Sequence, residues 1–307
     1  MTGKTKIGIA LGGGAARGWA HIGVIKRLMQ AGIKPDIVAG TSIGAVVGGC
    51  YVADKNEQLE EFALSLTRRR VFGLLDFNLA GSGLITGQRL CNQLNEHLSQ
   101  YRIESLERKF VAVATELGTG HEVWLNQGRL VDAMHASYAL PGIFKPVKIG
   151  GRWLIDGALV NPIPVSICRA LGAGIVIAVN LHKDIFGKGS VIHNHGTTEE
   201  ESKTGEDPKA EKGNGRAAMH LLHRQFFGRG DIAPGISTVM LDAFNITQDR
   251  IARSRLIGDP PDLLLAPSLN KIGLFDFHRA EEAIGAGYTA ADAMIDDITE
   301  LHAEQAA

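Results

Sequence analysis

Cysteine is scarce in the 307-residue chain, and the three that occur form no cluster. Cys50, Cys91 and Cys168 stand far apart in apolar surroundings, without the close spacing of metal ligands. We therefore expect buried thiols in a protein of a reducing compartment.

Clusters of other metal-binding residues are also missing from the sequence. His193 and His195 form one histidine pair and His220 and His223 another, but neither pair has a carboxylate or thiolate partner at a set spacing. We interpret them as solvated loop and helix histidines, so neither a metal ion nor another cofactor is expected.

Neither sign of charge dominates, because 32 Lys and Arg residues face 33 Asp and Glu residues and the formal net charge is −1. Such a chain has no global basic field that would attract nucleic acid or an anionic surface. Nucleic acid is therefore not an expected partner.

Long hydrophobic runs are absent as well. The longest apolar stretch, about residues 40–53, is shorter than the roughly 20 residues that a membrane-spanning helix needs. Residues 1–6 lead directly into a predicted strand without the pattern of a signal peptide. We expect a cytoplasmic protein, at most peripheral to the inner face of a membrane, and the oligomeric state is left open.

The most informative segment that is present is Gly40-Thr41-Ser42-Ile43-Gly44, between a short β-branched run and a small, apolar run. A G-x-S-x-G pattern at a strand-to-helix junction is typical of a nucleophile elbow, in which a sharp turn exposes the serine hydroxyl. Gly40 and Gly44 would then be required because side chains at these positions would collide. The alternative is a turn in which Ser42 only caps the helix.

A glycine-rich loop, Gly12-Gly13-Gly14-Ala15-Ala16-Arg17-Gly18, follows a predicted strand and precedes a helical pattern that begins at Trp19. A dinucleotide fingerprint is excluded because Arg17 stands where its third glycine belongs, and a phosphate loop because Trp19 stands where its lysine belongs. An oxyanion hole remains, with the amides of Gly12, Gly13, Gly14 and Ala15 as candidate donors. The alternative is packing room between helix and strand.

A third segment, Asp156-Gly157-Ala158, follows Gly151-Arg152-Trp153-Leu154-Ile155. Asp-Gly between apolar runs is a strong signal for a hairpin turn. A rigid turn at the edge of a sheet can also aim a carboxylate, so both interpretations hold together.

Taken in order, four segments of the chain resemble the patatin-like phospholipases. They are residues 12–18 with the trailing His21-Ile22-Gly23-Val24, the elbow at Ser42, the run Ala136-Ser137-Tyr138-Ala139-Leu140-Pro141-Gly142-Ile143-Phe144-Lys145-Pro146, and Asp156-Gly157-Ala158. The resemblance covers roughly residues 5–180. Tyr138 departs from the pattern, because many members of the family carry a smaller residue there.

The resemblance implies a Ser–Asp dyad hydrolase, with Ser42 as nucleophile, Asp156 as base and amides of the glycine loop as oxyanion hole. Arg17, Gly40, Gly44 and Gly157 would support this site. The substrate would be a lipid ester, such as a phospholipid or lysophospholipid. A catalytically idle lipid-binding or regulatory protein of the same fold, and a carboxylesterase acting on other esters, are the alternatives.

A dyad needs a physical account, because a carboxylate with a pKa of roughly 4 is a poor base for a hydroxyl. Burial must raise the pKa of the carboxyl group, or the site must stabilise the alkoxide as it forms. The rival arrangement is a Ser-Asp-His triad. Histidines follow Asp156 at positions 182, 193, 195, 220, 223, 278 and 302, and none of them follows a predicted strand. The dyad is favoured.

Composition and pattern predict an α/β fold. The chain is 45% hydrophobic and 21% charged, enough for one large core. Short apolar runs between helical patterns indicate a mostly parallel central sheet with helices on both faces. The resemblance implies a three-layer sandwich formed by a single catalytic domain, residues 5–307. Helices are expected over residues 59–70, after a cap at Thr86, and from a cap at Asp276 to Ile298.

Two further expectations concern surface segments. Residues 184–216 have almost no large apolar residue after Ile192 and are predicted to form a mobile loop. A lipid substrate also calls for peripheral contact with a membrane, for which Phe226-Phe227 with the neighbouring arginines and Leu84-Ile85 are the candidates.

Overall fold

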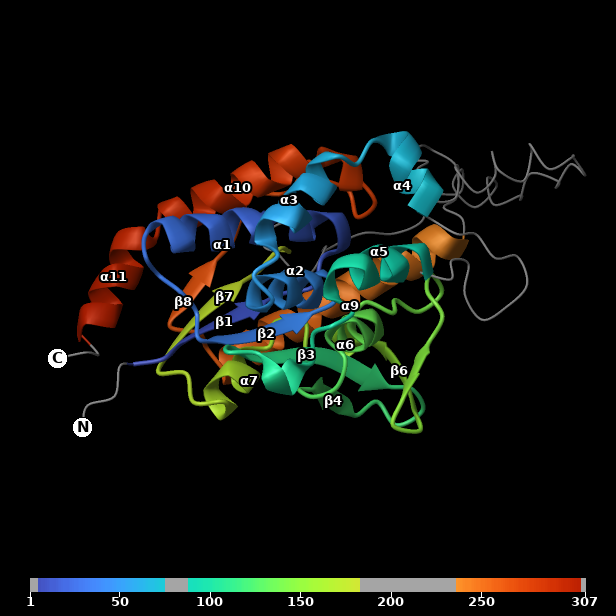
Figure 1. Ribbon diagram of the computed structural model, residues 1–307, viewed down its shortest axis with the longest axis horizontal. Coiled ribbons are helices and arrows are strands. Elements are labelled where there is room, and N and C mark those ends of the chain that lie inside the picture. Colours follow the sequence, from blue (N-terminus) through green and yellow to red (C-terminus); the bar gives the residue numbers. More distant parts are fainter. Residues whose placement is uncertain (1–4, 75–87, 183–235, 305–307) are drawn as a thin grey trace, which may run out of the picture. The chain divides into compact units, whose positions relative to one another are not determined.

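The computed structural model describes residues 5–74, 88–182 and 236–304 (Figure 1). The chain divides into a main unit, residues 1–185 with 246–307, and a second unit, residues 186–245. The single domain expected over residues 5–307 stays a prediction. The predicted mobile loop, the cap at Thr86 and the two candidate membrane segments lie outside the described residues.

An eight-stranded sheet organises the main unit, in the order β5-β6-β3-β2-β1-β7-β8, with β4 paired to β3. The parallel strands are β1 (Ile7–Leu11), β2 (Ile37–Thr41), β3 (Lys109–Glu116), β7 (Ile175–Val179) and β8 (Leu263–Leu265). The antiparallel strands are β4 (Glu122–Leu125), β5 (Val147–Ile149) and β6 (Arg152–Asp156). The predicted α/β class with a mostly parallel sheet is confirmed.

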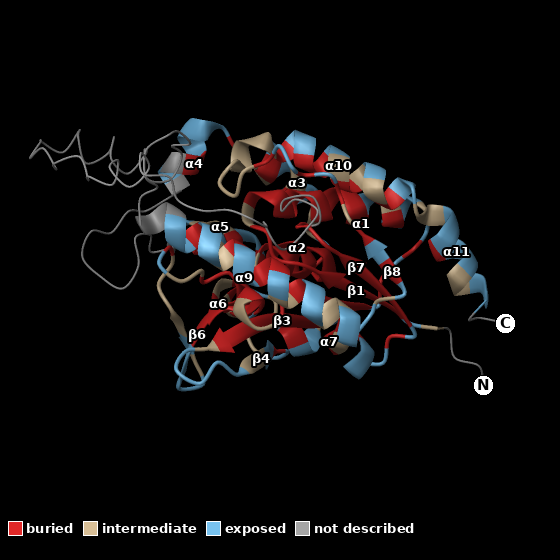
Figure 2. Cartoon of the chain, turned by 180° about the vertical axis from the view of Figure 1, so that it is seen from behind, coloured by how far each residue is buried: buried red, intermediate tan, exposed pale blue. Residues whose placement is uncertain are grey.

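Helices cover both faces of this sheet (Figure 1). Those of the main unit are α1 (Ala20–Gln30), α2 (Ile43–Val52), α3 (Asn56–Leu64), α4 (Arg68–Leu74), α5 (Gln88–Leu98), α6 (Leu130–Ser137), α7 (Val165–Ala170), α10 (Ala280–Asp292) and α11 (Ile295–Glu304). Of helix α9 (Ile236–Gly258), residues 246–258 belong to the main unit. The central strands are buried on both faces because helices lie above and below them (Figure 2).

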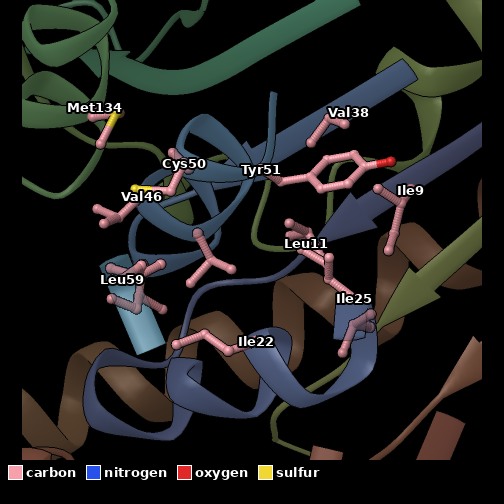
Figure 3. Close-up of a cluster of buried hydrophobic side chains, with 14 of the residues drawn as sticks. Ile9, Leu11, Ile22, Ile25, Val38, Val46, Cys50, Tyr51, Leu59 and Met134 are labelled. Atoms are coloured by element: carbon pink, nitrogen blue, oxygen red, sulfur yellow. The ribbon is translucent and has the colours of Figure 1, made fainter. Parts of the chain in front are cut away.

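Two clusters of buried side chains result, one on each face of the sheet. The larger lies between the sheet and helices that include α1, α2, α6 and α10. In Figure 3, Ile22 and Ile25 of α1 point toward Leu11 of β1, with Tyr51 of α2 nearby. The smaller cluster lies under α7 and contains Ile37, Val111 and Ile167. Strands β2 and β3 contribute side chains to both clusters, which hold these strands in place.

The helix predicted over residues 59–70 is wrong in one respect, because two helices replace it. Helix α3 ends at Leu64 and α4 begins at Arg68. The Ser65 hydroxyl donates to the Phe62 carbonyl at 2.6 Å, and the Thr67 hydroxyl accepts from the Arg70 N–H at 3.2 Å. Short hydroxyl side chains compete with the backbone ladder and cap a new helix, which explains the break.

The predicted last helix is also divided. Asp276 does not cap it, because its carboxylate accepts from the N–H of Gly273, which precedes it, at 2.9 Å. Helix α10 ends at Asp292, where the Met294 N–H donates to the Ala291 carbonyl in a tightened turn. Helix α11 then begins at Ile295.

Two glycines allow the backbones of α1 and α10 to touch. A β-carbon on Gly23 would lie 1.9 Å from the Ile284 carbonyl oxygen, and one on Gly287 would lie 1.9 Å from the Ala20 carbonyl oxygen. No side chain fits at either position, so the close crossing of these helices depends on both glycines.

We therefore expect Gly287→Ala to destabilise the protein by about 1–3 kcal/mol, because the added methyl group must push the two helices apart. Gly285→Ala on the same helix is the matched control, since a β-carbon there would meet nothing within 4 Å. That control should be neutral or stabilising by up to about 1 kcal/mol. Thermal melting of both variants measures the difference, and equal melting temperatures would contradict the packing argument.

Candidate active site

Strand β3 brings the ends of β2 and β6 together. Val113 of β3 pairs with Thr41, the last residue of β2, and the next residue, Ala114, pairs with Asp156, the last residue of β6. Strand β4 occupies the opposite edge of β3, so β2 and β6 follow one another along a single edge. Because β6 is antiparallel to β3, its last residue arrives directly beside Ser42.

Ser42 has the geometry of an elbow between β2 and α2. Its φ of 56° and ψ of −123° are unusual for a residue with a side chain, and such a conformation costs on the order of 1–3 kcal/mol. Its N–H donates to the Ser137 hydroxyl at 2.9 Å, and its carbonyl accepts from the Ala45 N–H at 2.9 Å. The side chain makes no capping bond to α2, so Ser42 is not a simple helix cap.

The glycines that flank Ser42 are needed for close packing. A β-carbon on Gly40 would lie 2.5 Å from the Gly44 carbonyl oxygen, and one on Gly44 would lie 2.2 Å from the Leu11 carbonyl oxygen. The sharp turn expected at this junction is therefore present, and α2 packs directly on the end of β1.

Asp156 is buried and receives two hydrogen bonds on its carboxylate. The Ser42 hydroxyl donates to Oδ2 at 2.6 Å, and the Ala158 N–H donates to Oδ1 at 2.9 Å. The backbone around it is held as well, because the Thr115 hydroxyl donates to the Asp156 carbonyl at 2.8 Å. A β-carbon on Gly157 would lie 2.3 Å from the Val113 carbonyl oxygen, so only glycine fits there.

The hairpin turn expected at Asp156-Gly157 is wrong. Asp156 ends β6 and leads into a short 3-10 turn, Gly157–Leu159, whereas the hairpin lies before it at Gly150-Gly151, between β5 and β6. Asp-Gly suits this 3-10 turn because the aspartate carboxylate accepts a hydrogen bond from the Ala158 N–H and the glycine lets the chain pass close to β3.

Burial raises the pKa of the Asp156 carboxyl group to about 7, although the hydrogen bonds from Ser42 and Ala158 oppose the rise. Desolvation penalises the charged form and thereby makes the carboxylate more basic. This is the change in basicity that a carboxylate needs in order to take a proton from a hydroxyl near neutral pH.

The glycine loop lies against Ser42, and its amides fall into two groups. A β-carbon on Gly13 would lie 3.6 Å from the Ser42 Cβ atom. The Gly12 N–H donates to the Val179 carbonyl at 3.2 Å, and the Gly13 N–H to the Pro162 carbonyl at 3.0 Å, so both amides are already engaged. Within the described ranges, the N–H groups of Gly14 and Ala15 meet no such acceptor. Of the four amides predicted as donors, only those of Gly12 and Gly13 have a backbone acceptor within the described residues, and the role of all four stays a prediction.

Two buried side chains hold the loop in place. The Arg17 Nε atom donates to the Ile272 carbonyl at 2.8 Å, which ties the loop to a distant segment. His21 contacts the Gly12 carbonyl through Nε2 at 2.8 Å. Burial lowers the pKa of His21 to about 4, so the ring is neutral at physiological pH. A carbonyl oxygen can only accept, so Nε2 carries the proton.

Some residues at the site had no assigned role in the sequence. Ser137 and His21 lie inside segments that carry the resemblance, and this was the signal in the sequence that could have identified them. Gln248 of α9 gave no signal at all. It is 4% exposed, and its Oε1 atom would lie 3.5 Å from a β-carbon on Gly13.

One expectation about the histidines is wrong. His182 does follow a strand, since it comes three residues after the end of β7, and it is buried. Burial, with a contribution from the charge of Arg17, lowers the pKa of His182 to about 4. In the described part of the chain, however, Asp156 receives its hydrogen bonds from Ser42 and Ala158 and from no histidine.

The described residues offer neither a metal site nor a membrane-spanning helix. No group of three or more His, Cys, Asp or Glu side chains there could hold a metal ion. Among the same residues, no helix is both long and apolar enough to cross a membrane.

Comparison with known proteins agrees with the four segments identified in the sequence. Residues 9–169 match the family model described as patatin-like phospholipase. An uncharacterized NTE family protein of Mycobacterium tuberculosis is 31% identical over 321 residues, which cover 92% of this chain and 89% of that protein. Patatin-like phospholipase domain-containing protein 6 of Mus musculus is 32% identical over 188 residues, covering 59% of this chain and 14% of that protein.

Among solved structures, that of VipD from Legionella pneumophila has a TM-score of 0.43 and 13% sequence identity, and covers 96% of this chain and 67% of that one. The family model matches the glycine loop, the elbow and the aspartate together, and the mycobacterial relative matches nearly the whole chain. The chain therefore belongs to the patatin-like phospholipase family of lipid ester hydrolases.

Proposed function

We propose that the protein hydrolyses carboxylic esters of lipids, phospholipids or lysophospholipids in particular, with Ser42 as nucleophile and Asp156 as general base. The observation that carries the proposal is the 2.6 Å hydrogen bond from the Ser42 hydroxyl to a buried carboxylate. The substrate class is supported by the family to which the chain belongs.

In the first half of the reaction, the Ser42 Oγ atom attacks the ester carbonyl while its proton moves to Asp156 Oδ2. The carbonyl oxygen becomes negatively charged in the tetrahedral intermediate. When the intermediate collapses, the ester C–O bond breaks and the leaving alcohol takes the proton from Asp156. An acyl group then remains on Ser42.

In the second half, water attacks the acyl group and gives a proton to Asp156. Collapse of the second tetrahedral intermediate breaks the bond to Ser42 Oγ, which recovers that proton, and the fatty acid leaves. Asp156 thus serves as base in both attacks and as acid in both departures.

The developing oxyanion needs hydrogen-bond donors that are already oriented. The amides of Gly14 and Ala15 are the proposed donors, because those of Gly12 and Gly13 are bonded within the fold. One such donor contributes about 3–4 kcal/mol to transition-state stabilisation. His21, by holding the Gly12 carbonyl, positions the peptide groups that precede these donors.

Replacing either member of the dyad should abolish hydrolysis. We expect Ser42→Ala and Asp156→Asn each to lose nearly all activity on a short, soluble ester, and the double variant to lose no more, because the two groups act as a unit. Labelling by a fluorophosphonate should occur in the wild type and disappear in Ser42→Ala. An Asp156→Asn variant with most of its activity would show that another base serves Ser42.

The rate should depend on pH through Asp156. Because the carboxyl group must be ionised to act as base and burial raises its pKa to about 7, kcat/KM on an uncharged soluble ester should rise with pH and level off above about 7. A profile that levels off near pH 4 would contradict this assignment.

Stability should change in the opposite direction over the same pH range. A carboxyl group whose pKa is higher in the folded state stabilises the fold at low pH, and this stabilisation is lost as pH rises from about 4 to about 7. Asparagine does not ionise in this pH range. The melting temperature of Asp156→Asn should therefore rise relative to that of the wild type as the pH increases from about 4 to about 7.

His21 should matter through the loop that it holds. His21→Phe leaves the buried Gly12 carbonyl without its donor, so we expect kcat on a soluble ester to fall roughly 10- to 100-fold with little change in KM. His21→Gln is the control, because its amide can still donate and should restore part of the loss. Equal activity of the Phe variant and the wild type would show that the bond does not position the loop.

A further inference from the structure

Three side chains form a row across adjacent strands at one edge of the sheet. Lys148 of β5 pairs with Trp153 of β6, and the Leu117 N–H, just past the end of β3, donates to the Trp153 carbonyl at 2.8 Å. Residues directly opposite each other in antiparallel strands share a face of the sheet. Leu117, Trp153 and Lys148, hereafter the surface row, therefore lie side by side on one face.

The surface row is open to solvent. Leu117 and Trp153 are each 51% exposed, although both are large and apolar. Lys148 is exposed as well, and its Nζ atom lies 5.5 Å from the centre of the Trp153 ring. Isolated exposed apolar residues are common on proteins, but here a leucine, a tryptophan and a lysine are contiguous.

The surface row lies at the edge of the sheet that carries the dyad. Strand β2 ends opposite Val113, just before Ser42, whereas β3 continues to Glu116 and Leu117 follows it. Trp153 precedes Asp156 by three residues on β6, or about 10 Å along the strand. The hairpin that ends in the catalytic carboxylate therefore also carries Trp153 and Lys148.

The charge around the surface row is locally positive although the chain as a whole is nearly neutral. Apart from the buried Asp156, the acidic side chains of the adjoining strands are bound by arginines, Glu116 by Arg152 at 2.8 Å and Glu122 by Arg255 at 3.0 Å. Lys148 has no carboxylate partner among the described residues, and neither has Lys145, which precedes β5. This edge thus presents positive charge beside apolar side chains.

We propose that the surface row is the contact of this protein with an anionic lipid surface, an inference that rests on the proposed lipid hydrolysis. Tryptophan favours the boundary between headgroups and acyl chains, because its ring is both apolar and polar. Lysine next to it adds attraction to anionic lipid, and leucine adds buried apolar area. Contact here would bring the lipid to the hairpin that ends in Asp156, although the Asp156 side chain lies on the other face of β6 from Trp153.

The test measures binding to vesicles separately from catalysis. Full-length wild type, Leu117→Ser/Trp153→Ser and Lys148→Gln are sedimented with vesicles of phosphatidylcholine alone and of an equal mixture with phosphatidylglycerol. We expect the wild type to prefer the mixed vesicles. The double variant should bind them at least about tenfold more weakly, because two insertable side chains are lost. Lys148→Gln should lose most of the preference for the anionic lipid.

Ile257→Ser is the matched control. Ile257 is 85% exposed near the end of α9. The chain continues from there to β8, which lies at the end of the sheet opposite to β5 and β6. This variant should bind vesicles like the wild type. All variants should hydrolyse a short, soluble ester at the wild-type rate, which shows that the fold and the dyad are intact.

Wild-type binding by the double variant, or an equal loss in Ile257→Ser, would overturn the proposal. A double variant that changes only the oligomeric state in light scattering, with unchanged vesicle binding, would overturn it too and assign the surface row to a contact between copies. Failure of the wild type to hydrolyse the soluble ester would instead refute the proposed function, and vesicle binding would still decide the role of the surface row. Trp153→Phe offers a second measurement, since it should retain binding but remove a blue shift of tryptophan emission on mixed vesicles.

Discussion

Backbone pairing along one edge of β3 fixes where the Ser42 hydroxyl meets the Asp156 carboxylate. Strand β2 pairs with this edge as far as Val113, and β6 pairs with it from Ala114 onward. The last residues of two strands that are distant in sequence therefore become neighbours. A shift of β6 by one residue would turn the aspartate to the other face of the sheet. The bond from Thr115 to the Asp156 carbonyl and the close approach of Gly157 to β3 hold the register.

Several features of the site cost stability and are maintained by the packing around them. Ser42 is held at a positive φ, and Asp156 is ionised at high pH only against the cost of desolvation. Buried clusters on both faces of the sheet offset these costs. Residues that are poor choices for stability thus meet at the proposed dyad, as is common at functional sites.

The sequence was informative wherever the relevant pattern is local. The strand, glycine loop and elbow are contiguous segments, so their residue types predicted the turn at Ser42 and the helix that follows. The hairpin at Asp156-Gly157 was predicted wrongly, because the same dipeptide suits a 3-10 turn when β3 runs close beside it. The break between α3 and α4 depended on hydroxyl bonds from Ser65 and Thr67 that a helical pattern does not register.

Interactions between distant segments could not be predicted in the same way. The amides of Gly12 and Gly13 look the same in sequence as that of Gly14, yet Val179 and Pro162 engage them. These bonds have a consequence for the proposed hydrolysis. Three glycines in succession would otherwise sample many conformations, and ordering them has an entropic cost. Since the loop is anchored by β7, the Pro162 segment and His21, this ordering takes place once, during folding, and every substrate meets a loop that has already lost its freedom.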